Sequence, residues 1–281
     1  MAKLRPNQFL LPSGALITEL PILFQTEMVQ ANLEGRKKQT RRTRGLDSIN
    51  VDPDFWSRKG DPRMYLERFW DSTREINPNP IEIHFVFKDP LGENTYIKSP
   101  FGKPGDLLWV KETFGRSAID DDLTDTPYLY KADYIVPEWV TPALSTNHWK
   151  PSIHMPKDAA RIWLMIEDIR VERVQEISEE DAIAEGIGRW VETRMKSQPT
   201  HYKVYTDSDP EALYTSCPKD SFETLWVSIN GEESWQSNPW VWVIRYRILS
   251  KTGRPSLEVM EQAYSEIVNP KSEIREEAHH D

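Results

Sequence analysis

Residues 35–42 read Gly-Arg-Lys-Lys-Gln-Thr-Arg-Arg, and they carry the strongest indication of how this chain folds. They follow a short helical pattern, and Gly35 suits the left-handed residue that commonly ends a helix. The next residues predict an extended segment, in which Thr40 and Arg42 share one face because side chains alternate along a strand. Lys37 lies in the turn directly after the glycine. The end of a helix is therefore expected to bring a lysine, a hydroxyl and a guanidinium into one small region.

This spacing, Gly35-x-Lys37-x-x-Thr40-x-Arg42, resembles the signature of ASCH domains, which are small β-barrels of the PUA-like superfamily. Further segments look like other parts of the ASCH proteins carried by phages and prophages: Pro-Gly-Asp-Leu-Leu-Trp-Val at 104–110, Trp-Lys-Pro-Ser-Ile-His-Met-Pro at 149–156, the helix at 178–187 and the strand at 240–246. The resemblance covers roughly residues 18–250. It implies an α+β fold, namely a PUA-like small β-barrel with flanking helices and several insertions.

The order of the predicted elements favours one such domain over a doubly wound sheet, because strands and helices do not alternate regularly. We predict that four segments belong to one curved, largely antiparallel sheet: 38–44, 107–112, 161–174 and 240–248. Three polar stretches interrupt the domain as insertions, at about 46–80, 116–150 and 189–217. Residues 251–281 are expected to form a C-terminal helix and a charged tail.

Composition excludes several classes of protein. The net charge of −10 excludes a surface that attracts polyanions as a whole, so contact with nucleic acid must come from a local basic patch. A single cysteine, Cys217, excludes an internal disulfide. No apolar run reaches the length of a membrane span, and residues 1–15 lack the hydrophobic block of a signal peptide. We expect a cytoplasmic protein, in the host cytoplasm if a phage encodes it, and no membrane partner.

Familiar cofactor and metal motifs are missing from the sequence. Gly102-Lys103 is followed by proline and has no glycine five residues before it, so it is not a phosphate-binding loop. His148 and His154 are six residues apart, with no third ligand in view. We therefore predict no cofactor and no metal site.

Some ASCH proteins similar to this one hydrolyse N4-acetylcytidine with a lysine, a threonine and a glutamate, and the resemblance implies that these are Lys37, Thr40 and Glu185. A threonine hydroxyl attacks well only after a base removes its proton, and a lysine can be that base where like charges favour its neutral amine. A glutamate in the last turn of a helix is placed unfavourably, because its negative charge opposes the helix dipole. Residues that break such local preferences are often found at functional sites. These points favour an amidohydrolase.

The basic segment and a later strand also supply candidates for binding a modified nucleoside or RNA: Arg36, Arg41, Arg42, Arg44, Trp109 and Lys111. Arginines contact phosphates, and an aromatic ring can stack on a base. The structural alternative is a solvated edge strand, which lysine and arginine protect from pairing, with the tryptophans packed in the core. If the segment binds RNA, reversing Arg41 and Arg44 to glutamate should abolish binding without unfolding, since exposed charges seldom decide stability.

Three functions stay open on the sequence alone. The first is an amidohydrolase that acts on an acylated cytidine or a related modified nucleoside. The second is a phage accessory module that binds RNA or another nucleic acid without catalysis, although the acidic net charge disfavours tight non-specific binding. The third is a phage protein that binds a host protein through its insertions. The sequence predicts no particular oligomeric state.

Overall fold

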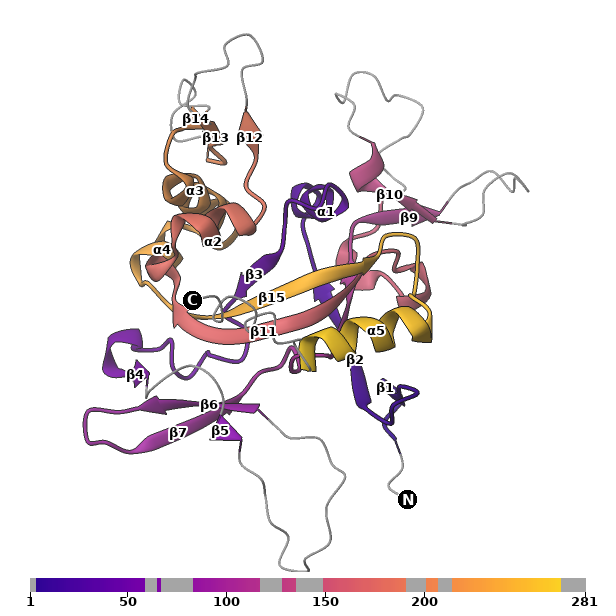
Figure 1. Ribbon diagram of the computed structural model, residues 1–281. Helices are drawn as coiled ribbons and strands as arrows, with labels where there is room; N and C mark the ends of the chain where they lie inside the picture. The colour runs from indigo at the N-terminus through magenta and orange to yellow at the C-terminus, as the bar shows by residue number, and fades with distance from the viewer. Residues whose placement is uncertain are drawn as a thin grey trace, which may run out of the picture.

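The computed structural model describes residues 4–58, 65–66, 83–116, 128–134, 149–190, 201–206 and 214–268. Within them the chain has an α+β fold, with helices and small sheets arranged around one large sheet (Figure 1). His148, the tail at 269–281 and parts of all three predicted insertions lie outside the described residues.

The large sheet has six strands and forms the centre of the fold. Their order is β1 (Gln8–Leu10), β2 (Leu16–Leu23), β8 (Leu107–Lys111), β11 (Trp163–Arg173), β15 (Trp240–Ser250) and β3 (Gln39–Arg42). Neighbours pair antiparallel, except that β2 and β8 are parallel. The prediction that four segments share one largely antiparallel sheet is confirmed. Among the described strands the sheet runs from β1 to β3 without closing into a barrel.

Smaller elements surround this sheet. The α-helices are α1 (Thr26–Leu33), α2 (Glu179–Ala184), α3 (Pro218–Asn230), α4 (Glu232–Gln236) and α5 (Leu257–Val268). The short 3-10 helices are η1 (Pro53–Phe55), η2 (Lys131–Asp133), η5 (Ser152–His154), η6 (Lys157–Ala159) and η7 (Val174–Glu176). The small sheets consist of β4 (Ser57–Arg58), β5 (Tyr65–Leu66), β6 (Ile83–Lys88) and β7 (Asn94–Lys98), of β9 (Phe114–Arg116) and β10 (Tyr128–Tyr130), and of β12 (Arg189–Trp190), β13 (His201–Lys203) and β14 (Tyr214–Thr215).

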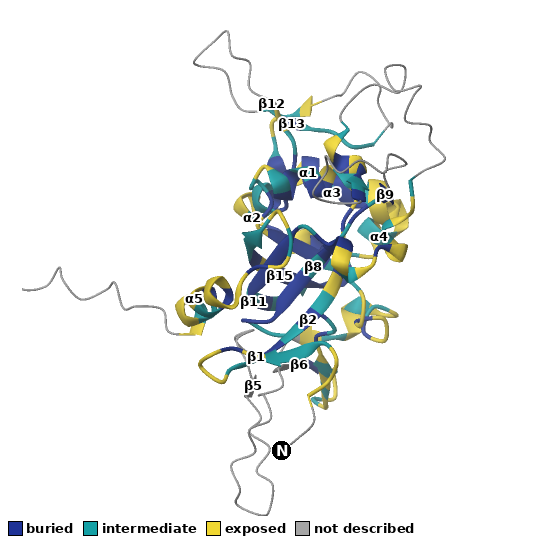
Figure 2. Cartoon of the chain, turned by 90° about the vertical axis from the view of Figure 1, so that its right-hand side faces the viewer, coloured by how far each residue is buried: buried dark blue, intermediate teal, exposed yellow. Residues whose placement is uncertain are grey.

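Side chains of β11 alternate between the two faces of the large sheet, and each face has its own core. Trp163 and Met165 pack in a cluster that includes Met260 of α5, so α5 covers this face. Leu164 and Ile166 point to the other face and join the larger cluster, to which α1, α3 and β6 contribute. The central strands β8, β11 and β15 are accordingly the most buried part of the chain in Figure 2.

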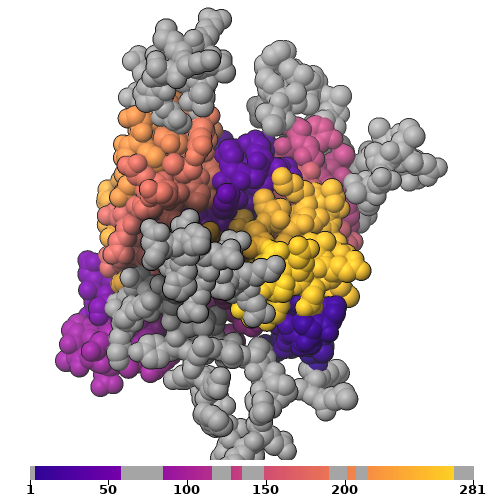
Figure 3. Space-filling view, in the orientation of Figure 1, coloured from indigo at the N-terminus to yellow at the C-terminus, as the bar shows by residue number. Residues whose placement is uncertain are grey.

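The end strand β3 is where helices from distant parts of the chain meet. Helix α1 directly precedes it, while α2 and α3 pack on each other beside it (Figure 1). In the space-filling view of Figure 3, α1 lies at the surface between the region of α2 and α3 and that of β9 and β10. The basic segment found in the sequence is thus placed at the edge of the sheet and between helices.

Candidate functional site

The turn after α1 places Lys37 at the edge of the sheet. Gly35 has a φ of +75°, the left-handed conformation predicted for the residue that ends this helix. The backbone N–H groups of Arg36 and Lys37 both donate to the carbonyl oxygen of Ala31, at 2.9 and 3.1 Å. These bonds satisfy the end of the helix and turn the chain into β3.

Helix α2 brings Glu185 to the same place from a distant part of the sequence. The hydroxyl of Ser178 accepts a hydrogen bond from the N–H of Asp181 at 3.1 Å, which caps the start of the helix. At its end, Gly186 has a φ of +86°, and a Cβ added there would lie 2.7 Å from the Cβ of Lys37. Glycine at this position therefore lets the end of α2 approach the lysine closely.

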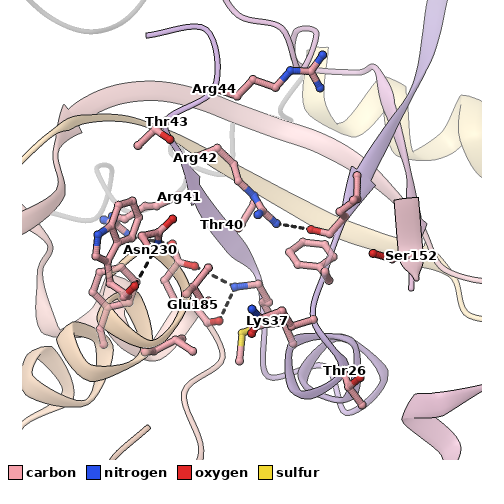
Figure 4. Close-up of a pocket in the computed structure, with 18 of the residues that line it drawn as sticks. Thr26, Lys37, Thr40, Arg41, Arg42, Thr43, Arg44, Ser152, Glu185 and Asn230 are labelled. Carbon is pink, nitrogen blue, oxygen red and sulfur yellow. Dashed lines mark hydrogen bonds and ion pairs between the residues drawn. The ribbon is translucent and has the colours of Figure 1, made fainter. Parts of the chain in front are cut away.

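Lys37 and Glu185 form a buried ion pair (Figure 4). The lysine Nζ lies 2.9 Å from Oε2 of Glu185 and donates to the backbone carbonyl of the same residue at 2.6 Å. The two residues are only 2% and 3% exposed. Burial lowers the pKa of Lys37; Glu185 opposes this effect, and the nearby Arg42 and Arg41 add to it. The amine gives up its proton more easily than an exposed lysine does, which is a property of a general base.

Arg41 holds Glu185 from the other side within a network of charges. Its Nη1 lies 3.0 Å from Oε1 of Glu185, which leaves the other carboxylate oxygen to the lysine. Its Nη2 bonds to Glu172 and lies 3.0 Å from Asp181, and Arg170 bonds to both of these acids. Desolvation disfavours the charge of Arg41, but the carboxylates outweigh it and raise its pKa. The arginine therefore fixes the orientation of Glu185 as a permanent cation.

Thr40 lines a pocket together with this pair. The pocket has a volume of about 540 Å³ and opens beside β3. Its charged lining consists of Lys37, Arg41, Arg42, Arg44 and Glu185, and its apolar wall includes Phe24, Met28, Phe222, Leu225, Trp226 and Ile229. The Thr40 hydroxyl has no hydrogen-bond partner among the described residues, yet it is not sealed off from solvent. The three residues predicted for catalysis thus meet at one pocket, and their catalytic roles stay a prediction.

Arg42 and Arg44 also line the pocket, and in Figure 4 both lie above Lys37. The Nη2 of Arg42 donates to the carbonyl oxygen of Leu23 at 2.6 Å, and its guanidinium lies 5.0 Å from the ring centroid of Phe24. Burial lowers the pKa of Arg42, although Glu185 opposes this. Arg44 is exposed, and its guanidinium has no partner among the residues that the structure describes.

The other predicted binding residues lie elsewhere. Arg36 donates to the carbonyl of Gly186 at 2.5 Å and so fastens the end of α2 to the turn after α1. The Nζ of Lys111 donates to the carbonyl of Ile153 at 2.5 Å and lies 5.6 Å from the ring centroid of Trp109. Arg36 lies beside Lys37, but neither it nor Trp109 nor Lys111 is part of the pocket lining.

The basic segment only partly fits a solvated edge strand. β3 is indeed the last strand of the large sheet and Arg44 is exposed, but Lys37 and Arg41 are 2% and 5% exposed. The premise that Arg41 is an exposed charge is therefore wrong. A glutamate at this position would face the carboxylates of Glu172 and Glu185, so we now expect its reversal to destabilise the fold.

Sequence reasoning missed the acids that hold Arg41 and the apolar wall of the pocket. Glu172 and Asp181 lie more than a hundred residues along the chain from Arg41, in segments that contain many other charged residues. Phe222 and Trp226 follow the regular apolar spacing of a buried helix, which does not reveal that the buried face also borders a pocket. An excess of acids at 172–181 is the signal that could have pointed to a buried cation.

Comparisons with protein-family models, with curated proteins and with solved structures find no match for this chain. The site is therefore interpreted from its own geometry. Within the described residues, no group of three or more histidine, cysteine or acidic side chains is arranged to hold a metal ion. Each described helix lacks either the length or the apolar character that crossing a membrane requires.

Proposed function

We propose that this protein hydrolyses the amide bond of an N4-acylated cytidine, with Lys37, Thr40 and Glu185 in the reaction. The observation that carries the proposal is the composition of the pocket. A lysine whose pKa is lowered by burial and a threonine hydroxyl without a described partner line the same cavity. The resemblance of residues 35–42 to ASCH domains supports this substrate class. As part of the same proposal, the large sheet corresponds to the main part of a PUA-like barrel.

The proposed reaction is an acyl transfer to Thr40. The neutral amine of Lys37 takes the proton of the hydroxyl, and Oγ1 forms a bond to the carbonyl carbon of the acyl group. When the tetrahedral intermediate collapses, the bond from that carbon to N4 breaks, and the Lys37 ammonium gives its proton to the departing amine. Water then attacks the threonine ester while Lys37 again accepts a proton, and this proton passes to the Thr40 oxygen as the carboxylic acid leaves.

Glu185 supports the lysine in both steps. Its carboxylate lies 2.9 Å from the lysine Nζ and stabilises the ammonium that forms whenever the amine accepts a proton. Because Arg41 holds the other oxygen of this carboxylate, Glu185 cannot turn away from the lysine without breaking a second ion pair. Glu185 is therefore a positioning residue in this reaction, and it does not touch the acyl group.

Incubation of the purified full-length chain with a panel of N4-acylated cytidines tests the proposal. The expected products are cytidine and the carboxylic acid in equal amounts, both measured by chromatography. Lys37→Ala should remove turnover, because the base that is proposed to activate the hydroxyl would be missing. Lys38→Gln is the matched control: it changes the exposed neighbour of Lys37 and should keep turnover. If the wild type converts no member of the panel, the hydrolase proposal fails.

Binding of a nucleotide or RNA without turnover is the second candidate function. Arg44 favours it, because an exposed arginine without a described partner borders the pocket. Ligand binding without product release in the same assay would select this function. The host-protein alternative concerns the insertions, parts of which lie outside the described residues. The described structure offers no argument for it.

A further inference from the structure

The charges that line the pocket are not balanced. Lys37 and Arg41 share the carboxylate of Glu185, and Arg41 has two further acids behind it. Arg42 and Arg44 also line the pocket, and neither forms an ion pair with any described carboxylate. The pocket thus contains two arginines without an ion-pair partner among the described residues.

Arg42 is held by the protein in a way that leaves donors unused. An arginine has five N–H donors, and one bond from Nη2 to the Leu23 carbonyl is the only hydrogen bond of this guanidinium within the described structure. Its Nε is buried without a partner, whereas Nη1 also lacks a partner but is not sealed off from solvent. Desolvation disfavours the charge of this half-buried guanidinium, and Glu185 opposes the effect without cancelling it. An anion in the pocket would offset this cost.

Arg44 extends the positive region toward solvent. In Figure 4 it lies above Arg42, with Thr43 between them along the chain, and the Arg42 side chain points from there toward Lys37 and Glu185 in the lower part of the view. The chain turns at once at Gly45, whose φ is +86°, so Arg44 is the last residue before the backbone leaves the pocket. The positive charges of the pocket therefore run from the exposed Arg44 through Arg42 toward Lys37, Thr40 and Glu185.

We propose that the pocket binds its acylated cytidine as a phosphate ester, with the phosphate held by Arg42 and Arg44 and the acylated base placed toward Lys37 and Thr40. The inference rests on the proposed function for the identity of the base, and on the unpaired arginines for the phosphate. Arginine guanidinium groups bind phosphate oxygens through paired, charge-assisted hydrogen bonds. The phosphate belongs either to a free nucleotide or to an RNA chain, because both present the same group to the arginines.

The kinetic test compares N4-acetylcytidine with its 5′-monophosphate on the full-length protein. The wild type should have a kcat/KM for the monophosphate that is higher by about tenfold or more, since two charge-assisted contacts are gained. Arg44→Gln should reduce this preference by about tenfold, Arg44→Lys should restore part of it, and Lys38→Gln should leave it unchanged. Equal kcat/KM values for the two substrates in the wild type would overturn the phosphate subsite, even if hydrolysis itself is confirmed.

A binding measurement separates this inference from the proposed reaction. Isothermal titration calorimetry with cytidine and with cytidine 5′-monophosphate needs no turnover. Tighter binding of the monophosphate, lost in Arg44→Gln and kept in Lys38→Gln, supports the subsite even if no acylated cytidine is hydrolysed. Equal binding of the two ligands overturns it.

The same titration distinguishes the two sources of phosphate. A short single-stranded RNA of cytidines is added in competition with the monophosphate. If the RNA displaces the monophosphate at a concentration lower than that of the monophosphate, the result supports the subsite and identifies an RNA chain as the source of the phosphate. Weaker or absent competition, together with tight monophosphate binding, supports the subsite for a free nucleotide.

Discussion

In the proposed site the Thr40 hydroxyl is the nucleophile, so a protein without it should still bind the substrate but should not hydrolyse it. Thr40→Ser keeps the hydroxyl and should keep part of the activity, whereas Thr40→Val keeps the shape of the side chain without a nucleophile. We expect the valine variant to lose about 10³-fold or more in kcat, as when an activated nucleophile is removed from other enzymes. Acetate release from N4-acetylcytidine measures both. A valine variant as active as the wild type would exclude acyl transfer to Thr40.

Burial of Lys37 should also be visible in the pH dependence of stability. Its pKa in the folded protein is lowered, whereas lysine in an unfolded chain titrates near about 10.4. Between these two values the unfolded state binds more protons than the folded state. The free energy of unfolding therefore rises with pH in this window, by at most about 1.4 kcal/mol per pH unit for one group. Below both values the cost of burying the charge is fully present.

Urea unfolding of the wild type and of Lys37→Met measures this effect. As the pH rises toward about 10.4, the pKa of lysine in an unfolded chain, the wild type should gain stability relative to the methionine variant, which has no amine to titrate. Curves that stay parallel over this range would show that the pKa of Lys37 is not lowered by burial.

At the scale of elements, the contact between the end of α2 and the turn after α1 assembles the site. A Cβ at Gly186 would meet the Cβ of Lys37 at 2.7 Å and that of Ala31 at 3.0 Å. Gly186→Ala should therefore strain the backbone and also push the lysine away from Glu185. Gly14→Ala is the matched control, because Gly14 has a φ of +85° with nothing within 4 Å of the added carbon.

Both variants replace a left-handed glycine, so both should lose some stability. We expect Gly186→Ala to lose about 1 kcal/mol or more beyond Gly14→Ala, the typical cost of overpacking, and to lose turnover as well. Thermal or urea unfolding together with the hydrolysis assay provides the measurement. Equal stability and activity of the two variants would mean that the close approach of α2 does not set the geometry of Lys37.

The elements that local signals control were predictable from the sequence. Gly35 ends α1 because a left-handed residue is required there, and Ser178 starts α2 because its hydroxyl caps a nearby N–H. The inward direction of Arg41 was not predictable. It depends on Glu172, Asp181 and Glu185, which only the fold brings into range, with β15 between β11 and β3 in the sheet. Spacing within one segment contains no information about such distant partners.

At the scale of the whole molecule, the chain is acidic and has one small cationic region at the pocket, so its binding of nucleic acid should depend only weakly on salt concentration. If Arg42 and Arg44 make the phosphate contacts, two charges at most are neutralised. The logarithm of the binding constant for single-stranded RNA should then fall with the logarithm of salt concentration with a slope of about −1.4. A titration of RNA binding from low to moderate salt measures the slope. A much steeper slope would place the binding surface on many cations outside this pocket.

The sequence also placed four of the six strands of the large sheet correctly, because the apolar alternation of β8, β11 and β15 reflects burial on both faces, but it did not assign β1 and β2 to this sheet. It did not indicate that the pocket lies at the free edge of β3, where both sides of one strand reach a single cavity. Thr40 and Arg41 alternate along β3, yet both line the pocket. Alternation predicts that neighbouring residues lie on opposite faces of a sheet. In a strand at the edge of the sheet, side chains from both faces can nevertheless reach the same cavity.

Release of acetate from N4-acetylcytidine in a single turnover, with the protein in excess, tests the proposed function most directly. Under these conditions product release does not limit the rate, so the measurement reports the chemical step at the pocket. The wild type is predicted to release one acetate for each substrate bound. Lys37→Ala is predicted to release acetate about 10³-fold more slowly or not at all. Equal rates for the two proteins, or bound substrate that stays intact in the wild type, would contradict the assignment of this pocket as an amidohydrolase site.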